Sequence, residues 1–276
     1  MGCIFMSELS TMLSYAFIQK ALIVGVLTGV IAAVLGVSLV LKNYSMIGDG
    51  LSHVGFGAFA IAISLGMAPL YFSIPVVIVA AFFTLKISNN KKINADGMIA
   101  LLSSGALSIG VMATSLTKGM NVDIYQFMFG SILATTSAEV YITVAVSIFV
   151  ILYYILFYNK IFAVTFDETF SRAIGINVNF YRVILSVITA IVIVLGMRVI
   201  GALLISGLTI FPALTSFRIA KSFKGSIVAS AIVAFVSVVM GVIISFFLST
   251  PTGATIVVSN LFIYILAVIY GKVRKI

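Results

Sequence analysis

Long hydrophobic runs alternate with short polar linkers along the chain, and this alternation is its most informative feature. Nine such runs can be distinguished, each close to the roughly 20 apolar residues that one membrane-spanning helix needs. They cover about 17–41, 50–66, 69–86, 97–117, 139–158, 180–197, 199–217, 225–248 and 255–271. The pattern predicts an all-α polytopic membrane protein with eight to nine transmembrane helices.

The seventh run, 199–217, differs from the others because it contains helix-interrupting residues. Gly201, Gly207 and Pro212 lie within it. Irregular backbone at membrane depth is tolerated where protein buries it. We therefore expect this segment to be a broken or partly re-entrant helix.

The composition excludes a water-soluble enzyme. Of the 276 residues, 62% are hydrophobic and 8% are charged, with a mean hydropathy of +1.30. Soluble domains have roughly 45–50% apolar and about 25% charged residues. No room remains for a large soluble domain, so we expect residues 1–276 to form a single transmembrane domain. The one cysteine, Cys3, excludes an intrachain disulfide.

The basic residues indicate how the chain is oriented. Counted by alternate linkers, thirteen of the sixteen lysines and arginines fall on one side, leaving Lys20, Lys118 and Arg198 on the other. Cytoplasmic loops carry the excess of positive charge in membrane proteins. The split predicts an outside N-terminus and a cytoplasmic C-terminus, and it explains the net charge of +9 without a nucleic-acid partner.

One pair of ionisable residues, Asp49 and His53, stands at the start of an apolar run. Their spacing of four places both side chains on one face of a helix. A carboxylate and an imidazole suit Zn²⁺, Mn²⁺ or Fe²⁺, and two copies in a symmetric dimer would supply four ligands. A structural role remains open: Asp49 could cap a helix beginning at Gly50, with His53 at the interface.

The longest linker on the predicted cytoplasmic side, 159–179, has its own helical signals. Thr165 or Asp167 could cap a short helix that ends at Gly175. An apolar residue recurs every four positions, at Phe166, Phe170 and Ile174. A short amphipathic helix of this kind suits docking into a partner's groove. A helix lying on lipid headgroups would show the same pattern, so both interpretations stay open.

Asp49 and His53 could also serve two other functional classes. An intramembrane aspartyl protease needs a second intramembrane aspartate and a G-x-G-D run, but Met46 occupies the first glycine position. A secondary metal/proton antiporter could use Asp49 and His53 as a proton relay, and this alternative remains open.

Five motifs in order along the chain resemble the permease subunits of bacterial zinc/manganese/iron ABC importers. They are IGDGLSH at 47–53, FGSIL at 129–133, FDE at 166–168 with AIGI at 173–176, GALLIS at 201–206 with FPA at 211–213, and PTGAT at 251–255. The resemblance therefore covers most of the chain.

This resemblance implies a fold similar to that of the cobalamin-importer permeases (type II ABC importers), with one fewer N-terminal span. It implies a homodimer in the bacterial cytoplasmic membrane, bound to cytoplasmic ATP-binding subunits and to an external metal-binding solute-binding protein. The sequence lacks a G-x-x-x-x-G-K-[ST] run, so the chain itself is not an ATPase and a separate subunit must hydrolyse ATP.

The resemblance also implies roles for particular residues. Asp49 and His53 would form the metal site on the translocation path, where Zn, Mn or Fe passes as cargo and no cofactor is permanently bound. The coupling segment that contacts the ATPase would lie at about 159–179. Its residues would include Phe166, Asp167, Glu168, Phe170, Arg172, Ala173 and Gly175.

Overall fold

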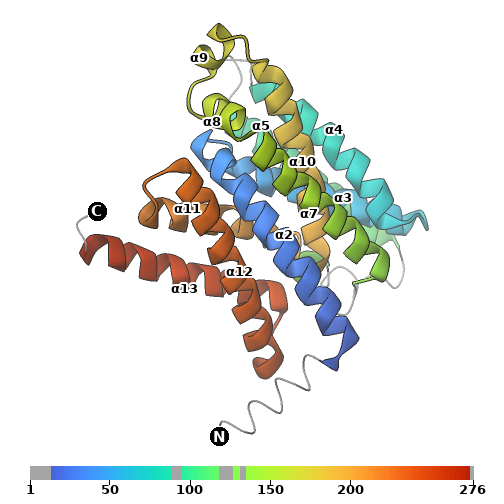
Figure 1. Cartoon of the computed structure of the whole chain (residues 1–276). Helices are drawn as coiled ribbons and strands as arrows, with labels where there is room; N and C mark the ends of the chain where they lie inside the picture. Colours follow the sequence, from blue (N-terminus) through green and yellow to red (C-terminus); the bar gives the residue numbers. More distant parts are fainter. Residues whose placement is uncertain (1–13, 89–94, 118–126, 131–134, 274–276) are drawn as a thin grey trace, which may run out of the picture.

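The computed structural model describes residues 14–88, 95–117, 127–130 and 135–273, and its regular secondary structure there is helical throughout (Figure 1). The helices are α2 (Ala16–Leu41), α3 (Ser45–Ser64), α4 (Pro69–Ser88), α5 (Ala95–Leu116), α7 (Ser137–Leu156), α8 (Tyr158–Phe166), α9 (Glu168–Ala173), α10 (Val178–Ile200), α11 (Ile205–Ile219), α12 (Phe223–Leu248) and α13 (Thr252–Val273). Seven are long and apolar enough to cross a membrane, and shorter apolar helices cover Pro69–Thr84 and Ile205–Ile219. The predicted all-α polytopic architecture is confirmed, and each predicted hydrophobic segment corresponds to one helix.

Helix α2 is the central element of the bundle. It packs against α7, α10, α11 and α12, and it runs through the middle of Figure 1. Small residues on α2 allow close approach: a Cβ added at Gly36 would lie 1.9 Å from the Thr209 carbonyl oxygen of α11. Close packing at small residues is how membrane helices commonly associate. The glycine therefore brings α11 directly against α2.

The turn between α2 and α3 determines where α3 begins. Asn43 has a φ of 59°, in the left-handed region that asparagine tolerates. The Tyr44 N–H donates to the Leu39 carbonyl at 2.8 Å, the closing bond of a Schellman-type helix end. Because this turn is so short, the next helix starts at Ser45, five residues before the hydrophobic run that predicts it.

The bundle has two distinguishable ends. At one end α8 and α9 form a bend, called here the elbow, which lies at the top of Figure 1. At the opposite end, called here the far end, Lys20 Nζ donates to Ser137 Oγ at 2.9 Å. Arg198 Nη1 pairs there with Glu139 Oε1 at 2.6 Å, joining the end of α10 to the start of α7.

The seventh segment runs between these two ends. It leaves the far end at Ala202, whose N–H donates to the Phe127 carbonyl at 2.9 Å. After α11 it leads into α12, where Phe223 makes an edge-to-face contact with Phe166 of the elbow, with ring centroids 5.8 Å apart. Helix α11 has 15 residues, or about 22 Å of length, and the turn at 201–204 separates it from α10. The chain is broken at 201–204, as expected from Gly201, whereas Gly207 and Pro212 lie within the continuous helix α11. The segment reaches both ends.

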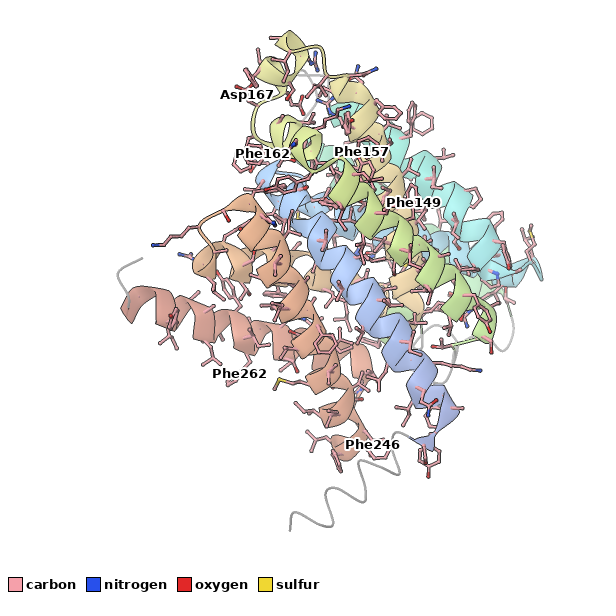
Figure 2. All side chains as sticks on the ribbon, in the orientation of Figure 1. Phe149, Phe157, Phe162, Asp167, Phe246 and Phe262 are labelled. Carbon is pink, nitrogen blue, oxygen red and sulfur yellow. The ribbon has the colours of Figure 1, made fainter. Side chains whose placement is uncertain are left out.

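Aromatic side chains cover the outside of the bundle. Phe149 on α7, Phe246 on α12 and Phe262 on α13 are exposed and lie around its periphery in Figure 2. An apolar outer surface of this extent would aggregate in water, whereas it suits contact with lipid chains.

Candidate functional site

Asp49 and His53 lie together on α3. The distance from His53 Nε2 to Asp49 Oδ2 is 3.6 Å. Asp49 is the fifth residue of the helix, and Tyr44 occupies the N-cap position. The structural alternative in which Asp49 caps a helix beginning at Gly50 is therefore wrong, because the preceding turn allows α3 to start earlier.

The spacing of these two atoms suits a shared metal ligand set. Two ligands of a tetrahedral zinc ion, each about 2.1 Å from the metal, lie about 3.4 Å apart. The observed 3.6 Å is close to that edge length and too long for a strong hydrogen bond. The His53 side chain is 14% exposed and that of Asp49 is 35% exposed, so an ion can reach the pair.

Helix α11 contributes a third polar group. Ser206 Oγ donates to Asp49 Oδ1 at 3.3 Å, although the two residues are 157 positions apart. His53 Nδ1 is buried and has no hydrogen-bond partner among the described residues. Ser206 belongs to a motif that carries the family resemblance, but no spacing rule in the sequence connects it with Asp49.

Glycines hold α3 tightly against its neighbours. A Cβ at Gly50 would lie 2.7 Å from Ile99 Cγ2, and one at Gly57 would lie 2.6 Å from the Ala106 carbonyl oxygen, both on α5. A Cβ at Gly55 would lie 2.5 Å from Met197 Sδ of α10. The helix that carries the pair is thus packed closely on two sides.

One chain supplies an incomplete ligand set. Within the described ranges, no group of three or more His, Cys, Asp or Glu side chains gathers where it could hold a metal ion. A structural metal site normally has four protein ligands. Asp49 and His53 can therefore form a transient site alone, or half of a site shared with a second chain.

The predicted coupling segment folds into two short helices. Asp167 caps α9 by accepting a hydrogen bond from the Phe170 N–H at 2.9 Å, and Gly175 adopts a φ of 83° just after the helix. The expected capping by Asp167 and termination at Gly175 are confirmed. Asp167, labelled in Figure 2, lies at the tip of the elbow.

The prediction that one helix carries a continuous apolar stripe is wrong. Phe166 is the last residue of α8, whereas Phe170 belongs to α9 and Ile174 is its C-cap. The chain is extended at Asp167, with φ −146° and ψ 102°, so it bends between the two helices. All three apolar side chains are nevertheless exposed.

Glu168 is the centre of an ion cluster beneath the elbow. Its Oε1 is 2.7 Å from Lys42 Nζ, its Oε2 forms a close ion pair with Arg182, and Arg172 Nη2 lies 3.9 Å away. Lys42 also donates to the Val164 carbonyl at 2.9 Å. The side chains of Lys42 and Arg182 are only 5% and 7% exposed, so Glu168 fastens α9 to the end of α2 and the start of α10.

The charges within the cluster shift the pKa values of Glu168 and Lys42. Burial alone would raise the pKa of Glu168, but the hydrogen bond and charge of Lys42, together with Arg182, outweigh it and lower that pKa. Burial lowers the pKa of Lys42, and the bond to Glu168 opposes this effect. The cluster therefore holds an ionised carboxylate against two desolvated cations near neutral pH.

Three of the motifs meet at the far end. Gly201 has a φ of 100°, and a Cβ there would lie 2.5 Å from the Met128 carbonyl oxygen. A Cβ at Gly253 would lie 1.7 Å from the Ile200 carbonyl oxygen. Residues 131–133 of the second motif lie outside the described residues. The glycines of 201–206 and 251–255 thus serve close backbone packing.

Comparison with known proteins places the chain among metal transport permeases. It is 29% identical over 253 residues to the manganese import system permease protein ScaB of Streptococcus gordonii, covering 92% of this chain and 91% of that protein. It is 29% identical over 254 residues to the high-affinity zinc uptake system membrane protein ZnuB of Haemophilus influenzae, covering 92% and 97%. These relatives belong to import systems, so they give no support to the antiporter alternative.

A solved structure and a family model agree with these relatives. The fold matches PsaBC from Streptococcus pneumoniae, solved in complex with Fab, with a TM-score of 0.85 and 28% identity over 97% of this chain and 95% of that one. The model of the ABC 3 transport family matches residues 14–271. The chain therefore belongs to the ABC 3 transport family, as the resemblance of its motifs predicts.

Proposed function

We propose that the chain is the permease subunit of an ATP-driven importer of Zn²⁺, Mn²⁺ or Fe²⁺. The observation that carries the proposal is the Asp49–His53 pair, held on one helix at a distance that suits a shared metal ion, in a member of a transport family. Oxygen and nitrogen donors are compatible with all three metals. The ion is cargo, so its site must bind it weakly enough for release.

A second copy of the chain would complete the site. Two Asp49–His53 pairs related by a twofold axis supply four ligands, the number that zinc prefers. Helix α5, which packs on α3, exposes Ser104, Ser108 and Ser115 on its outer face. Small polar residues suit contact with another membrane helix or with an aqueous path better than contact with lipid. We therefore place the homodimer seam on the α3–α5 side.

The elbow would receive the movement of a separate cytoplasmic ATPase. Its exposed side chains Phe162, Phe166 and Phe170 offer apolar contacts for a partner's groove. Glu168 connects α9 to Lys42, which lies in the turn that leads into α3. A displacement of the elbow can thus reach the helix that carries Asp49 through the ion pair between Glu168 and Lys42.

The orientation follows from the positive charge of the elbow end. We place the elbow end and the C-terminus in the cytoplasm of a bacterium, and the far end outside, where an external solute-binding protein would deliver the metal. Inward transport then runs from the far end, past Asp49 and His53, to the elbow end.

Metal uptake by cells that depend on this transporter tests the proposal. Asp49→Asn and His53→Gln keep side-chain size but remove a ligand, so each should abolish most ATP-dependent uptake of the radioactive metal. Ser52→Ala is the matched control, because its hydroxyl donates to the Asp49 backbone carbonyl on the same helix and does not touch the carboxylate. Full uptake by both ligand variants, at equal protein levels in the membrane, would contradict the site assignment.

A further inference from the structure

A cavity of about 520 Å³ lies between α7, α12 and the first helix of the elbow, α8. Its apolar wall consists of Ile155, Leu156, Ile227 and Val228. Its polar rim consists of Tyr158, Asn159 and Lys224. A volume of this size falls in the range of small-molecule sites in proteins.

The cavity opens toward the outside of the bundle. Ile155, Leu156 and Val228 are each more than half exposed, and the surface around them is apolar. In a membrane this face of α7 and α12 contacts acyl chains. An occupant of the apolar wall therefore has to come from the bilayer.

The rim of the cavity is positively charged. Lys224, which lines the cavity, is exposed in the first turn of α12. It forms no ion pair with a residue in the described part of the chain. Of the carboxylates at this end, Glu168 is engaged by Lys42 and Arg182.

The helix geometry at the rim adds to this charge. Helix α12 begins at Phe223, and its 26 residues direct the positive end of the helix dipole toward the rim. Lys224 of α12 and Asn159 of α8 both line the cavity. Together they offer an ammonium group and an N–H donor to an anion, with an apolar wall beside them.

We propose that this cavity binds one anionic phospholipid from the leaflet at the elbow end of the bundle. The phosphate lies between Lys224 and Asn159, and one acyl chain lies along Ile155, Ile227 and Val228. Anionic lipids are the bilayer components that combine these two chemistries, and basic pockets between membrane helices bind such headgroups. The preference for an anionic lipid over a zwitterionic one should be about fivefold for the single lysine.

The bound lipid would also support the elbow. Because the cavity is shared between α12 and α8, the lipid bridges the membrane bundle to the first half of the elbow. Its removal should loosen α8 and reduce the stimulation of the ATPase by metal. This consequence rests on the proposed function, whereas lipid binding itself does not.

Native mass spectrometry of the detergent-purified full-length permease can test the binding. The protein is incubated with phosphatidylglycerol or phosphatidylcholine of the same chain length. We expect about five times more bound phosphatidylglycerol in the wild type, and a loss of that preference in Lys224→Gln. Lys224→Arg should keep it. Lys272→Gln is the matched control, because this exposed lysine lies in the last turn of α13, outside the cavity.

A second variant and a competing anion distinguish a lipid site from a site for soluble phosphate. Ile227→Trp fills the apolar wall and should remove both lipids, whereas a phosphate site alone would be unaffected. Inorganic phosphate at millimolar concentration should not displace the lipid, and displacement would assign the rim to a soluble phosphate instead. The proposal would be overturned if the wild type retained the two lipids equally. It would also be overturned if Lys272→Gln lost the preference for phosphatidylglycerol as fully as Lys224→Gln. Metal uptake by the wild type would remain intact in that case, so the proposed function would stand.

Discussion

The ion cluster beneath the elbow gives the sharpest prediction about stability. Glu168→Gln keeps the shape of the side chain but removes the charge that compensates Lys42 and Arg182. The side chains of both cations are almost fully shielded from solvent and would remain so without a carboxylate. The variant should therefore be clearly less stable than the wild type, even though Glu168 lies at the surface of the bundle.

The size of the effect follows from burial. Breaking a buried ion pair by removing one partner costs about 3–5 kcal/mol. The Glu168 side chain is 30% exposed, so water partly compensates the change. We expect a loss of about 2–3 kcal/mol, which corresponds to a fall in Tm of about 5–10 °C for a chain of this size.

Thermal unfolding in detergent, monitored by size-exclusion chromatography, measures this difference in Tm. Arg172→Gln is the matched control, because it removes the exposed member of the same cluster, at 3.9 Å. Exposed pairs contribute about 0–1 kcal/mol, so its Tm should change by no more than about 4 °C. Equal effects of the two substitutions would refute the reasoning, since burial would then not determine the cost.

The difference in Tm between the wild type and Glu168→Gln should depend on pH. The lowered pKa of Glu168 means that its stabilisation is fully present above the ordinary carboxylate pKa of about 4.3. It is lost as the pH falls through the lowered value. The difference in Tm between wild type and Glu168→Gln should therefore be constant from about pH 5 to 8 and should shrink below about pH 4.

Two further predictions concern the far end. Gly253→Ala places a methyl group 1.7 Å from the Ile200 carbonyl oxygen and should cost about 3 kcal/mol or more, visible as a lower yield of folded protein. Gly271→Ala, which meets nothing within 4 Å, should leave that yield unchanged. Arg198→Met removes the cation that pairs with the buried Glu139, which keeps its hydrogen bond from the Thr136 N–H, and should lower Tm as strongly as Glu168→Gln. Adding Glu139→Gln should restore part of the loss, and a strictly additive double variant would contradict the pairing.

Hydrophobicity alone predicts the order of the apolar helices along the chain, but it does not give all of their ends. The run from Gly50 onward predicts α3 correctly, yet Ser45, Gly48 and Asp49 are too polar to be counted in it. They are helical because the short turn after α2 leaves no room for a longer linker. This difference decides the role of Asp49, which becomes part of a helix face instead of a cap.

Some contacts described above follow from local spacing in the sequence, whereas others join residues far apart in the chain. The pairing of Asp49 with His53 depends on a helical spacing of four, which the sequence displays directly. The contact of Ser206 with Asp49 and that of Lys42 with Glu168 join residues 157 and 126 positions apart. Such contacts depend on how α2, α3, α9 and α11 pack, and no local pattern encodes them.

The central claim is that two Asp49–His53 pairs hold one metal ion between two copies of the chain. Anomalous X-ray diffraction from crystals of the dimeric transporter soaked in Zn²⁺ or Mn²⁺ tests it most directly. The account predicts one peak on the twofold axis, within about 2.0–2.2 Å of a ligand atom from each of the four side chains. A peak that lies elsewhere, or an occupied site that persists in Asp49→Asn and His53→Gln, would contradict it.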